Sequence, residues 1–259
     1  MKKHIAILMA AVLCLGALVG CTSPAGDAEK LIVGLDDTFA PMGFRDSDNN
    51  LVGFDIDLAT AVGKELGMEI VFQPIDWNSK EMELNANTVD CLWNGMSRTP
   101  AREKSMTLSQ NYLNNKLIVM KNNGIVLNSK EDLANINYGT QAGSSSLEIL
   151  MEDDVFDVIK DTLSEYKDYD ECIMDMQAGR IDAMIVDAVL GKYKNENLDT
   201  KLEVAPFDFG DDLYVIGFRK EDTDLCAKVE QAIKAVIDSG EGKKISEKWF
   251  GEDLLLPIE

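Results

Sequence analysis

Histidine is almost absent from this 259-residue sequence, since its one histidine is His4, near the amino terminus. We expect His4 to be removed with an export signal, which leaves no histidine for a catalytic triad, a general base or a metal ligand. Basic residues are also scarce: 25 lysines and arginines stand against 46 aspartates and glutamates, and the formal net charge is −21. Because a phosphate backbone is bound by a basic surface, this acidity argues against a nucleic-acid partner. We expect no cofactor, metal or catalytic residue.

Cysteine is the next scarce residue. Beyond Cys21 only Cys91, Cys172 and Cys226 remain, and none of them lies in a CxxC pattern. An odd number of cysteines in an exported chain leaves at least one thiol unpaired. We therefore interpret these three residues as small buried side chains.

Long hydrophobic runs are lacking except at the amino terminus. Residues 5–20 are apolar, follow Lys2 and Lys3, and end in the sequence LVGC at Cys21. The run is short for a membrane span and typical of a signal peptide, the alternative being an uncleaved anchor. Its ending resembles a bacterial lipobox, in which the cysteine becomes the lipidated first residue. We therefore predict a signal peptide at 1–20, a lipid anchor on Cys21 and a polar tether through residue 29, which implies attachment to the outer face of the cytoplasmic membrane or a periplasmic location.

The rest of the chain alternates apolar, strand-like runs with amphipathic, helix-like segments. One helix is predicted from Asp55, its N-cap, to a stop at Gly67. This order predicts an α/β fold with parallel strands, whose loops gather at the carboxyl edge of the sheet, where open sheets bind ligands. The strand-like runs are residues 31–35, 68–72, 89–93, 138–141, 180–186 and 213–218.

The segment WNGMSRTPAR, residues 93–102, combines features that suit an anion. Pro100 is expected at the first position of a helix that Thr99 caps. A helix start attracts anions, and Arg102 can direct two N–H donors at a carboxylate, with Ser97 nearby. The alternative is a capped surface helix with a solvated arginine. Trp93 belongs either to a pocket wall or to the core.

Two more strand ends carry polar groups. Gly143 to Ser146 form a second small-residue loop that opens a helix, and the alternative is a serine-rich N-cap without a ligand. Asp187 ends another strand, where its carboxylate can accept hydrogen bonds from an ammonium group. Capping of the following helix is the alternative role for Asp187, and the two roles do not exclude each other.

Six segments occur in an order and at spacings that resemble the family-3 solute-binding proteins of amino-acid ABC importers. The resemblance covers residues 30–251. It implies a two-lobed periplasmic-binding-protein fold of the α/β class, each lobe a mainly parallel sheet flanked by helices, with two hinge crossings. Lobe 1 would comprise residues 30–115 and 214–259, and lobe 2 residues 116–213. The six segments are GLDDTFAPMGF, VGFDIDLATAVGKELG, VDCLWNGMSRTPAR, QAGSSS, AGRIDAMIVD and KWFG.

The resemblance also implies roles for individual residues at the two charged ends of an amino acid. Arg102 would pair with the α-carboxylate, helped by Ser97 and by backbone N–H groups near Gly95 and Ser145. Asp187 would receive the α-ammonium group.

For the ligand side chain, the resemblance implies that Phe39 and Trp77 form aromatic walls. Asp36 matches an acid that meets a polar or cationic side-chain end. The remaining ligand-binding positions are Asn94, Gln141 and Ser144.

The resemblance implies a monomeric binding lipoprotein that captures an L-amino acid and delivers it to the permease subunits of an ABC transporter, without making or breaking a bond. Asp36 and the aromatic rings favour a polar or basic amino acid, and cystine would also fit. One alternative is an enzyme resembling cyclohexadienyl dehydratases, which act on prephenate or arogenate, with Asp36 or Asp37 as general acid. The other alternative is an amino-acid sensor.

The implied lobes also bear on the cysteines. Cys91 and Cys226 would share lobe 1, and a bond from either to Cys172 in lobe 2 would hinder closure. Any disulfide is therefore expected to join Cys91 to Cys226.

Overall fold

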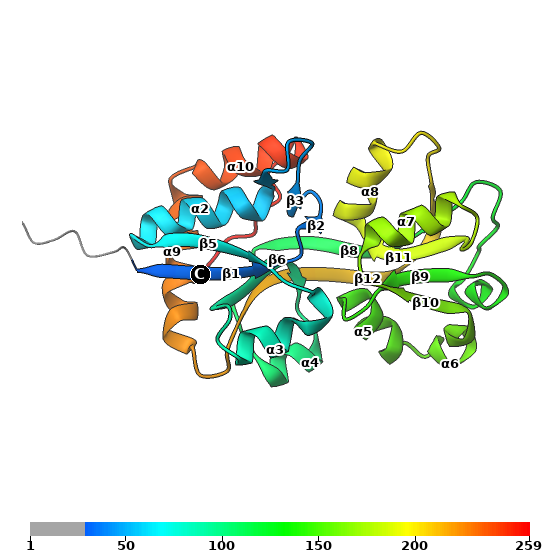
Figure 1. Ribbon diagram of the computed structural model, residues 1–259, viewed down its shortest axis with the longest axis horizontal. Coiled ribbons are helices and arrows are strands. Elements are labelled where there is room, and N and C mark those ends of the chain that lie inside the picture. Colours follow the sequence, from blue (N-terminus) through cyan, green and yellow to red (C-terminus); the bar gives the residue numbers. More distant parts are fainter. Residues whose placement is uncertain (1–28) are drawn as a thin grey trace, which may run out of the picture.

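The computed structural model describes residues 29–259, so the predicted signal peptide, Cys21 and the tether up to residue 28 lie outside it. The described chain forms two α/β lobes, side by side along the long axis of the molecule (Figure 1). No helix in this range is long and apolar enough to cross a membrane.

Lobe 1 contains both ends of the described chain. Its sheet is built from β1, which pairs in parallel with β5 on one side and with β6 on the other. The small β2–β3–β4 sheet lies above it in Figure 1. The strands of lobe 1 are β1 (Lys30–Leu35), β2 (Thr38–Phe39), β3 (Gly43–Arg45), β4 (Leu51–Val52), β5 (Glu69–Pro74), β6 (Cys91–Ser97) and β7 (Thr107–Leu108). Its helices are α2 (Phe54–Leu66), η1 (Trp77–Ser79), α3 (Lys80–Asn85), α4 (Pro100–Ser105), α9 (Thr223–Asp238) and α10 (Glu241–Phe250).

Lobe 2 has a second parallel sheet, in which β9 lies between β10 and β11. Its strands are β9 (Tyr138–Gln141), β10 (Leu163–Tyr166) and β11 (Ala183–Asp187). Its helices are η2 (Lys130–Asn135), α5 (Ser145–Glu152), α6 (Phe156–Ile159), η3 (Lys160–Thr162), α7 (Tyr169–Gln177) and α8 (Ala188–Glu196).

Two long strands run between the lobes: β8 (Leu113–Lys121) and β12 (Glu203–Phe218). They pair antiparallel with each other, and β8 joins β11 while β12 joins β6, so hydrogen bonding is continuous across both lobes in the order β10-β9-β11-β8-β12-β6-β1-β5. The expected fold, with parallel sheets and two crossings, is confirmed. The predicted lobe boundaries, at 115/116 and 213/214, fall inside these strands and stay predictions.

Local sequence signals account for the ends of several helices. Gly67 ends α2 in the left-handed conformation (φ 67°), which glycine adopts without steric cost. Thr99 caps α4, because its Oγ1 accepts from the N–H of Arg102 at 3.2 Å. Asp168 caps α7 in the same way. The helix ends at Gly67 and Thr99 were predicted, whereas the first half of β12 was not.

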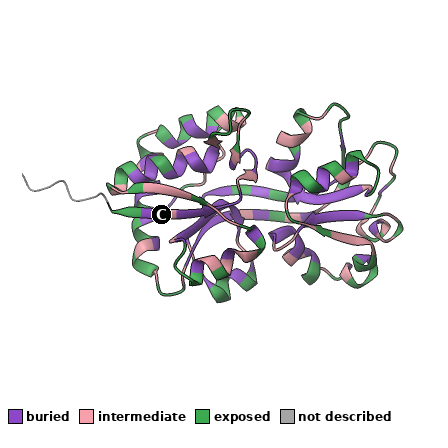
Figure 2. Cartoon of the chain, in the orientation of Figure 1, coloured by how far each residue is buried: buried purple, intermediate pink, exposed green. Residues whose placement is uncertain are grey.

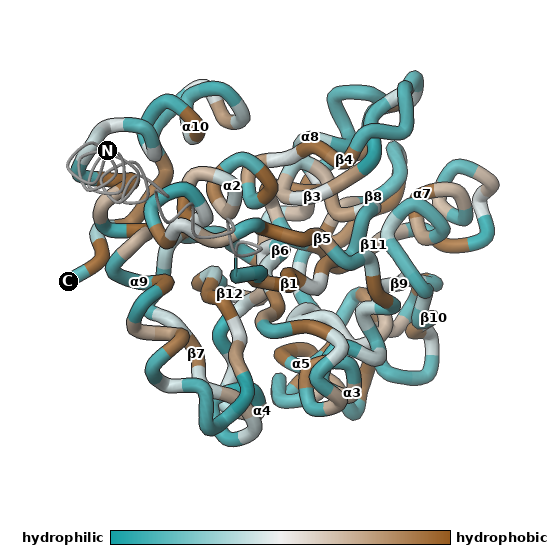
Figure 3. The backbone as a smooth tube through the Cα atoms, turned by 60° about the vertical axis from the view of Figure 1, so that its left-hand side comes forward, coloured by the Kyte–Doolittle hydropathy of each residue, from teal (hydrophilic) through white to brown (hydrophobic). Residues whose placement is uncertain are grey.

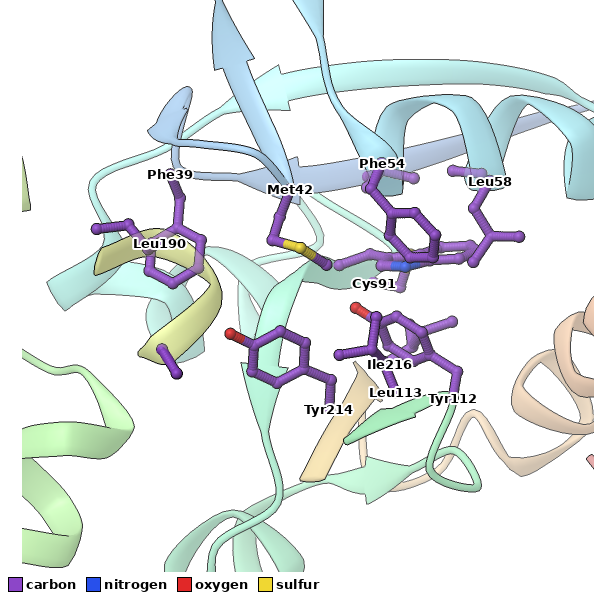
Figure 4. Close-up of a cluster of buried hydrophobic side chains, with 14 of the residues drawn as sticks. Phe39, Met42, Phe54, Leu58, Cys91, Tyr112, Leu113, Leu190, Tyr214 and Ile216 are labelled. Atoms are coloured by element: carbon purple, nitrogen blue, oxygen red, sulfur yellow. The ribbon is translucent and has the colours of Figure 1, made fainter. Parts of the chain in front are cut away.

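Buried side chains fill the interior of both lobes, where strands are mostly purple in Figure 2 and the outer faces of the helices are green. Figure 3 shows hydrophobic residues along β1 and β5 and mainly hydrophilic residues on the outermost turns. Close to the crossing strands, Tyr112 and Tyr214 lie side by side in the core, with ring centroids 6.3 Å apart (Figure 4). Aromatic packing therefore supports the strands that connect the lobes.

The three cysteines of the described chain are buried and unpaired. Burial raises the pKa of Cys172 and of Cys226 to about 12, so both thiols stay protonated and unreactive at neutral pH. Their interpretation as small buried side chains is confirmed, and no bond joins Cys91 to Cys226.

Asp55 is not the N-cap of α2, as the sequence had suggested. Gly53 holds that position, and Asp55 is a buried carboxylate, 1% exposed. It accepts hydrogen bonds from Trp93 Nε1 (3.1 Å), Gly95 N (2.7 Å) and Tyr112 Oη (3.0 Å). These bonds place Trp93 in the core and connect α2 to β6. Burial, opposed by the three donors, raises the pKa of Asp55 to about 7.

Asp55→Asn should lower the free energy of unfolding by about 1–3 kcal/mol at acidic pH, because the amide N–H₂ faces a donor and one bond is lost. The folded-state pKa of Asp55 is raised, so its stabilising contribution is complete below pH 4 and declines as the pH rises to about 7. The difference in free energy of unfolding between wild type and variant should therefore narrow between pH 4 and about 7. Urea unfolding from pH 4 to 8 measures it, with Glu65→Gln, an exposed change on the same helix, as control. A gap that stays constant with pH would contradict the prediction.

Candidate ligand-binding site between the lobes

Nine of the eleven predicted ligand-binding residues line one cavity between the lobes. They lie at the carboxyl ends of strands in both lobes and in the loops and helix starts nearby, as expected for an open α/β sheet. The space that they enclose, ≈ 10 Å³, is no more than a water molecule needs. An amino acid can therefore enter only if the lobes part. The nine are Phe39, Trp77, Asn94, Gly95, Arg102, Gln141, Ser144, Ser145 and Asp187.

Arg102 lies on α4 with its guanidinium buried, 1% exposed. Its Nη1 donates to the carbonyl of Ser97 at 2.9 Å, while Nε and Nη2 donate to Glu148 Oε1 at 3.2 and 2.9 Å. Nη2 also donates to the carbonyl of Gly143 at 3.4 Å, so of the five guanidinium N–H groups only one, on Nη1, remains for another acceptor. The predicted two-donor grip on a ligand carboxylate therefore requires that Glu148 withdraw or share the group.

Glu148 is a residue of the site that the sequence did not reveal. It lies in the first turns of α5, and its second oxygen accepts from Thr99 Oγ1 at 2.7 Å. An acid there ordinarily suits the helix dipole, so nothing in the sequence marked it as a contact between lobes. Its carboxylate joins α5 of lobe 2 to α4 of lobe 1.

The serines of both lobes meet beside Arg102. Ser97 lies outside the set of cavity-lining residues, but its Oγ donates to Ser145 Oγ at 2.8 Å. Ser144 caps α5 by accepting from the N–H of Leu147, so the N-cap role holds. Helix α5 begins at Ser145, where the first N–H groups have no partner within the helix.

Gly95 lines the cavity in the left-handed conformation (φ 59°), and its own N–H donates to Asp55 at 2.7 Å. That N–H is therefore not available to a carboxylate. A contribution from other backbone N–H groups near Gly95 stays a prediction.

Asp187, another residue of the cavity wall, is 2% exposed and is the last residue of β11. It occupies the N-cap position of α8, but its side chain makes no capping bond. Instead its Oδ1 accepts from Tyr214 Oη at 2.7 Å and from Asn115 Nδ2 at 3.0 Å. Burial, and then the nearby charge of Asp212, raise the pKa of Asp187 well above its usual value.

Asp36 lies beside the central cavity, and Gln141 Nε2 of lobe 2 donates to its Oδ2 at 2.7 Å. Asp36 borders a neighbouring cavity of ≈ 300 Å³ together with Trp77, Asp76 and Asp168. Burial raises the pKa of Asp36, although hydrogen bonds from its neighbours oppose the shift. Trp77 therefore lines both the central cavity and its acidic neighbour.

Lys80 is a second unforeseen contact between lobes. Only 4% exposed, it donates from Nζ to the carbonyl of Gly143 at 2.7 Å. Burial, and then the charge of Arg102, lower its pKa to about 8. Its lysine identity alone predicts a solvated surface group. Within residues 29–259 no cluster of three or more His, Cys, Asp or Glu could hold a metal ion.

Glu148→Ala should open the lobes in the absence of added amino acid. The variant leaves the Arg102 guanidinium without its carboxylate in the closed arrangement, and hydrogen bonds to a charged group contribute about 1.5–3 kcal/mol. Small-angle X-ray scattering should record a larger radius of gyration. Glu152→Ala, an exposed change on the same helix, is the control. Equal radii of gyration for the two variants would contradict this role of the Arg102–Glu148 ion pair in holding the lobes together.

Comparison with known proteins agrees with this architecture. The model of the bacterial extracellular solute-binding proteins, family 3, matches residues 31–252. The arginine-binding extracellular protein ArtP of Bacillus subtilis is 31% identical, over 96% of this chain and 98% of ArtP. The L-cystine-binding protein TcyJ of Escherichia coli is 30% identical, over 91% of this chain and 88% of TcyJ.

Among solved structures, an ABC uptake transporter substrate-binding protein of Streptococcus pneumoniae with bound histidine superimposes with a TM-score of 0.81 and 33% identity. The match covers 87% of this chain and 94% of that one. The family match spans nearly all of the described residues and both lobes. This chain therefore belongs to family 3 of the bacterial extracellular solute-binding proteins.

Proposed function

We propose that this protein captures an L-amino acid between its lobes and delivers it to the permease of an ABC transporter. The observation that carries the proposal is the pair of opposite charges in the lining of one cavity, which contains the cationic Arg102 and the start of α5 together with the acidic Asp187. An α-amino acid presents a carboxylate and an ammonium group at the same spacing in every member of its class. Such a cavity suits that shared zwitterion.

The assigned roles follow from these opposite charges. Arg102, Ser97 and the N–H groups at Ser145 bind the carboxylate, and Asp187 binds the ammonium. Phe39 and Trp77 flank the side chain, whose far end points toward Asp36 and Gln141. Asn94, Gly95 and Ser144 complete the wall.

The proposed cellular role extends beyond the described residues. A signal peptide at 1–20 directs export, and lipidation at Cys21 holds the protein at the membrane while the lobes, bounded within β8 and β12, open and close as a monomer. Relatives that bind arginine or cystine favour a polar or basic ligand, or cystine. A dehydratase would need a general acid over the substrate, and Asp36, whose carboxyl has a raised pKa, lies outside the central cavity. Binding is therefore preferred to catalysis.

A thermal-shift screen against the twenty L-amino acids, ornithine and cystine tests the proposal. The protein is first unfolded and refolded to remove co-purified ligand. At a hundred times its dissociation constant, a ligand adds about 2.7 kcal/mol to stability, so one or a few amino acids should raise the melting temperature clearly.

Arg102→Ala is the companion variant in this screen, because it removes the contact that all α-amino acids share. Every shift should shrink, since truncating one partner of a buried charge pair costs about 2–5 kcal/mol. Wild-type shifts in this variant would refute the assigned site. If no amino acid shifts the wild type, the transport proposal fails and prephenate turnover becomes the assay.

Asp36→Ala should separate basic from neutral ligands. Loss of the carboxylate should weaken arginine and lysine at least about tenfold, because a hydrogen bond to a charged group contributes about 1.5–3 kcal/mol. Glutamine should change much less, and it serves as the internal control in isothermal titration calorimetry. Equal losses for arginine and glutamine would overturn the role given to Asp36.

A further inference from the structure

Two buried carboxylates, Asp187 and Asp212, lie next to each other where β12 crosses between the lobes. Each is 2% exposed. The same side-chain nitrogen, Asn115 Nδ2, donates to Asp187 Oδ1 and to Asp212 Oδ2, at 3.0 Å in both cases. A single donor at hydrogen-bond distance from both carboxyl groups brings two like charges into close contact. Of the two, only Asp187 lines the central cavity.

No cation compensates this pair. Neither carboxylate forms an ion pair within residues 29–259, and the lysine that follows Asn115 on β8, Lys116, is exposed and pairs with Asp208 and Asp211 instead. The partners of the pair are neutral: Asn115 and the hydroxyl of Tyr214. Two adjacent, fully ionised carboxylates cannot both stay buried on neutral donors alone.

Asp212 has one oxygen without any partner. Its Oδ1 is buried and accepts no hydrogen bond, although buried polar atoms are almost always paired. This atom is where a proton or a cationic donor would relieve the largest desolvation cost. It lies on the crossing strand rather than in the wall of the cavity, so no motif of a ligand site identified it.

The other titratable groups that face Asp187 do not supply a charge. They are Tyr214 on the same strand as Asp212, and Tyr169 on α7. Burial raises the pKa of both tyrosines, and the charge of Asp187 raises them further, so both remain neutral. The raised pKa of Asp187, caused first by burial and then by Asp212, agrees with a carboxyl that retains a proton.

We propose that Asp212 makes Asp187 hold a proton, shared within this pair, and that the ammonium group of the amino acid replaces that proton on binding. The inference rests on the proposed function, since it concerns the same ammonium. Asp212 is a positioning residue that acts through Asp187. The displaced proton goes to solvent, and ligand and proton compete for one carboxylate.

This exchange sets the pH response of the protein. Burial alone already raises the pKa of Asp187 above the ordinary value for an aspartate, about 3.9, and the charge of Asp212 raises it further. With Asp212 beside it, Asp187 takes up its proton at higher pH. The affinity for the amino acid therefore falls on acidification. It rises with pH up to the point at which Asp187 has already lost its proton in the absence of ligand. For exchange of one proton, the dissociation constant changes about tenfold per pH unit within that window.

Isothermal titration calorimetry in two buffers of different ionisation enthalpy tests the exchange, with acetate and MES at the acidic end and phosphate and Tris near neutral pH. The difference between the two heats, divided by the difference in buffer ionisation enthalpy, counts the protons released per ligand. L-Arginine is the probe, because its own charges do not change between pH 5 and 8. Wild type should release close to one proton at the acidic end of this range and bind more tightly as the pH rises.

Asp212→Asn should still bind L-arginine, but its affinity should begin to fall only at a lower pH than that of wild type, and it should release fewer protons between pH 5 and 8. Burial still raises the pKa of Asp187 in this variant, whereas the charge of Asp212 is gone. Asp211→Asn, the neighbouring exposed aspartate, is the matched control and should behave as wild type. If Asp212→Asn does not fold, the number of protons that wild type releases on binding still tests the exchange.

The outcomes separate this inference from the proposed function. Binding of L-arginine by wild type without proton release, or an identical pH profile in Asp212→Asn, overturns the exchange and leaves amino-acid binding intact. If L-arginine does not bind, L-glutamine, equally constant in charge over this range, replaces it. Failure of every amino acid in the thermal-shift screen overturns both.

Discussion

The antiparallel pairing of β8 with β12 is the constraint on which the site depends. These strands join two parallel sheets so that the carboxyl edges of both face one gap, and loops far apart in sequence therefore meet there. The register shifts along β12 are of the kind that lets a strand bend and twist between two bodies. The same strands carry Asn115, Asp212 and Tyr214 to Asp187, so hinge and ligand site share side chains. A change of lobe angle must alter the polar contacts of Asp187.

Local features could be predicted from the sequence because their partners lie within a few residues. Gly67 ends α2 and Thr99 caps α4 for reasons that need no tertiary structure. The same reasoning gave a wrong prediction for Asp55, because its hydrogen-bond partners are far away in the sequence. They are Trp93, Gly95 and Tyr112, at separations of 38, 40 and 57 residues. An acid before an apolar stripe is typical of an N-cap, and only the packing of α2 against β6 turns it inward.

The candidate site divides in the same way. The family resemblance placed nine residues on one cavity, and eight of them lie in the shared segments, which sit at strand ends. Glu148, Lys80 and Asp212 carry no such mark, since acids and lysines are most often solvated and their partners come from the other lobe or from the crossing strands. The sequence therefore predicts residues that lie at strand ends of the family's common fold. It does not predict buried charged residues whose partners lie on the other lobe or on the crossing strands.

The distribution of these buried charges bears on ligand choice. Arg102, which lines the cavity, and Lys80 lie near the single carboxylate of Glu148, whereas Asp187, which also lines the cavity, has Asp212 beside it and no cation within the described residues. Burial of unbalanced charge is costly unless an opposite charge accompanies it. An amine without a carboxylate, or a carboxylic acid without an amine, would compensate one of these two groups of charges and leave the other uncompensated. A zwitterion compensates both at once, so on the proposed binding mode closure itself discriminates in favour of α-amino acids.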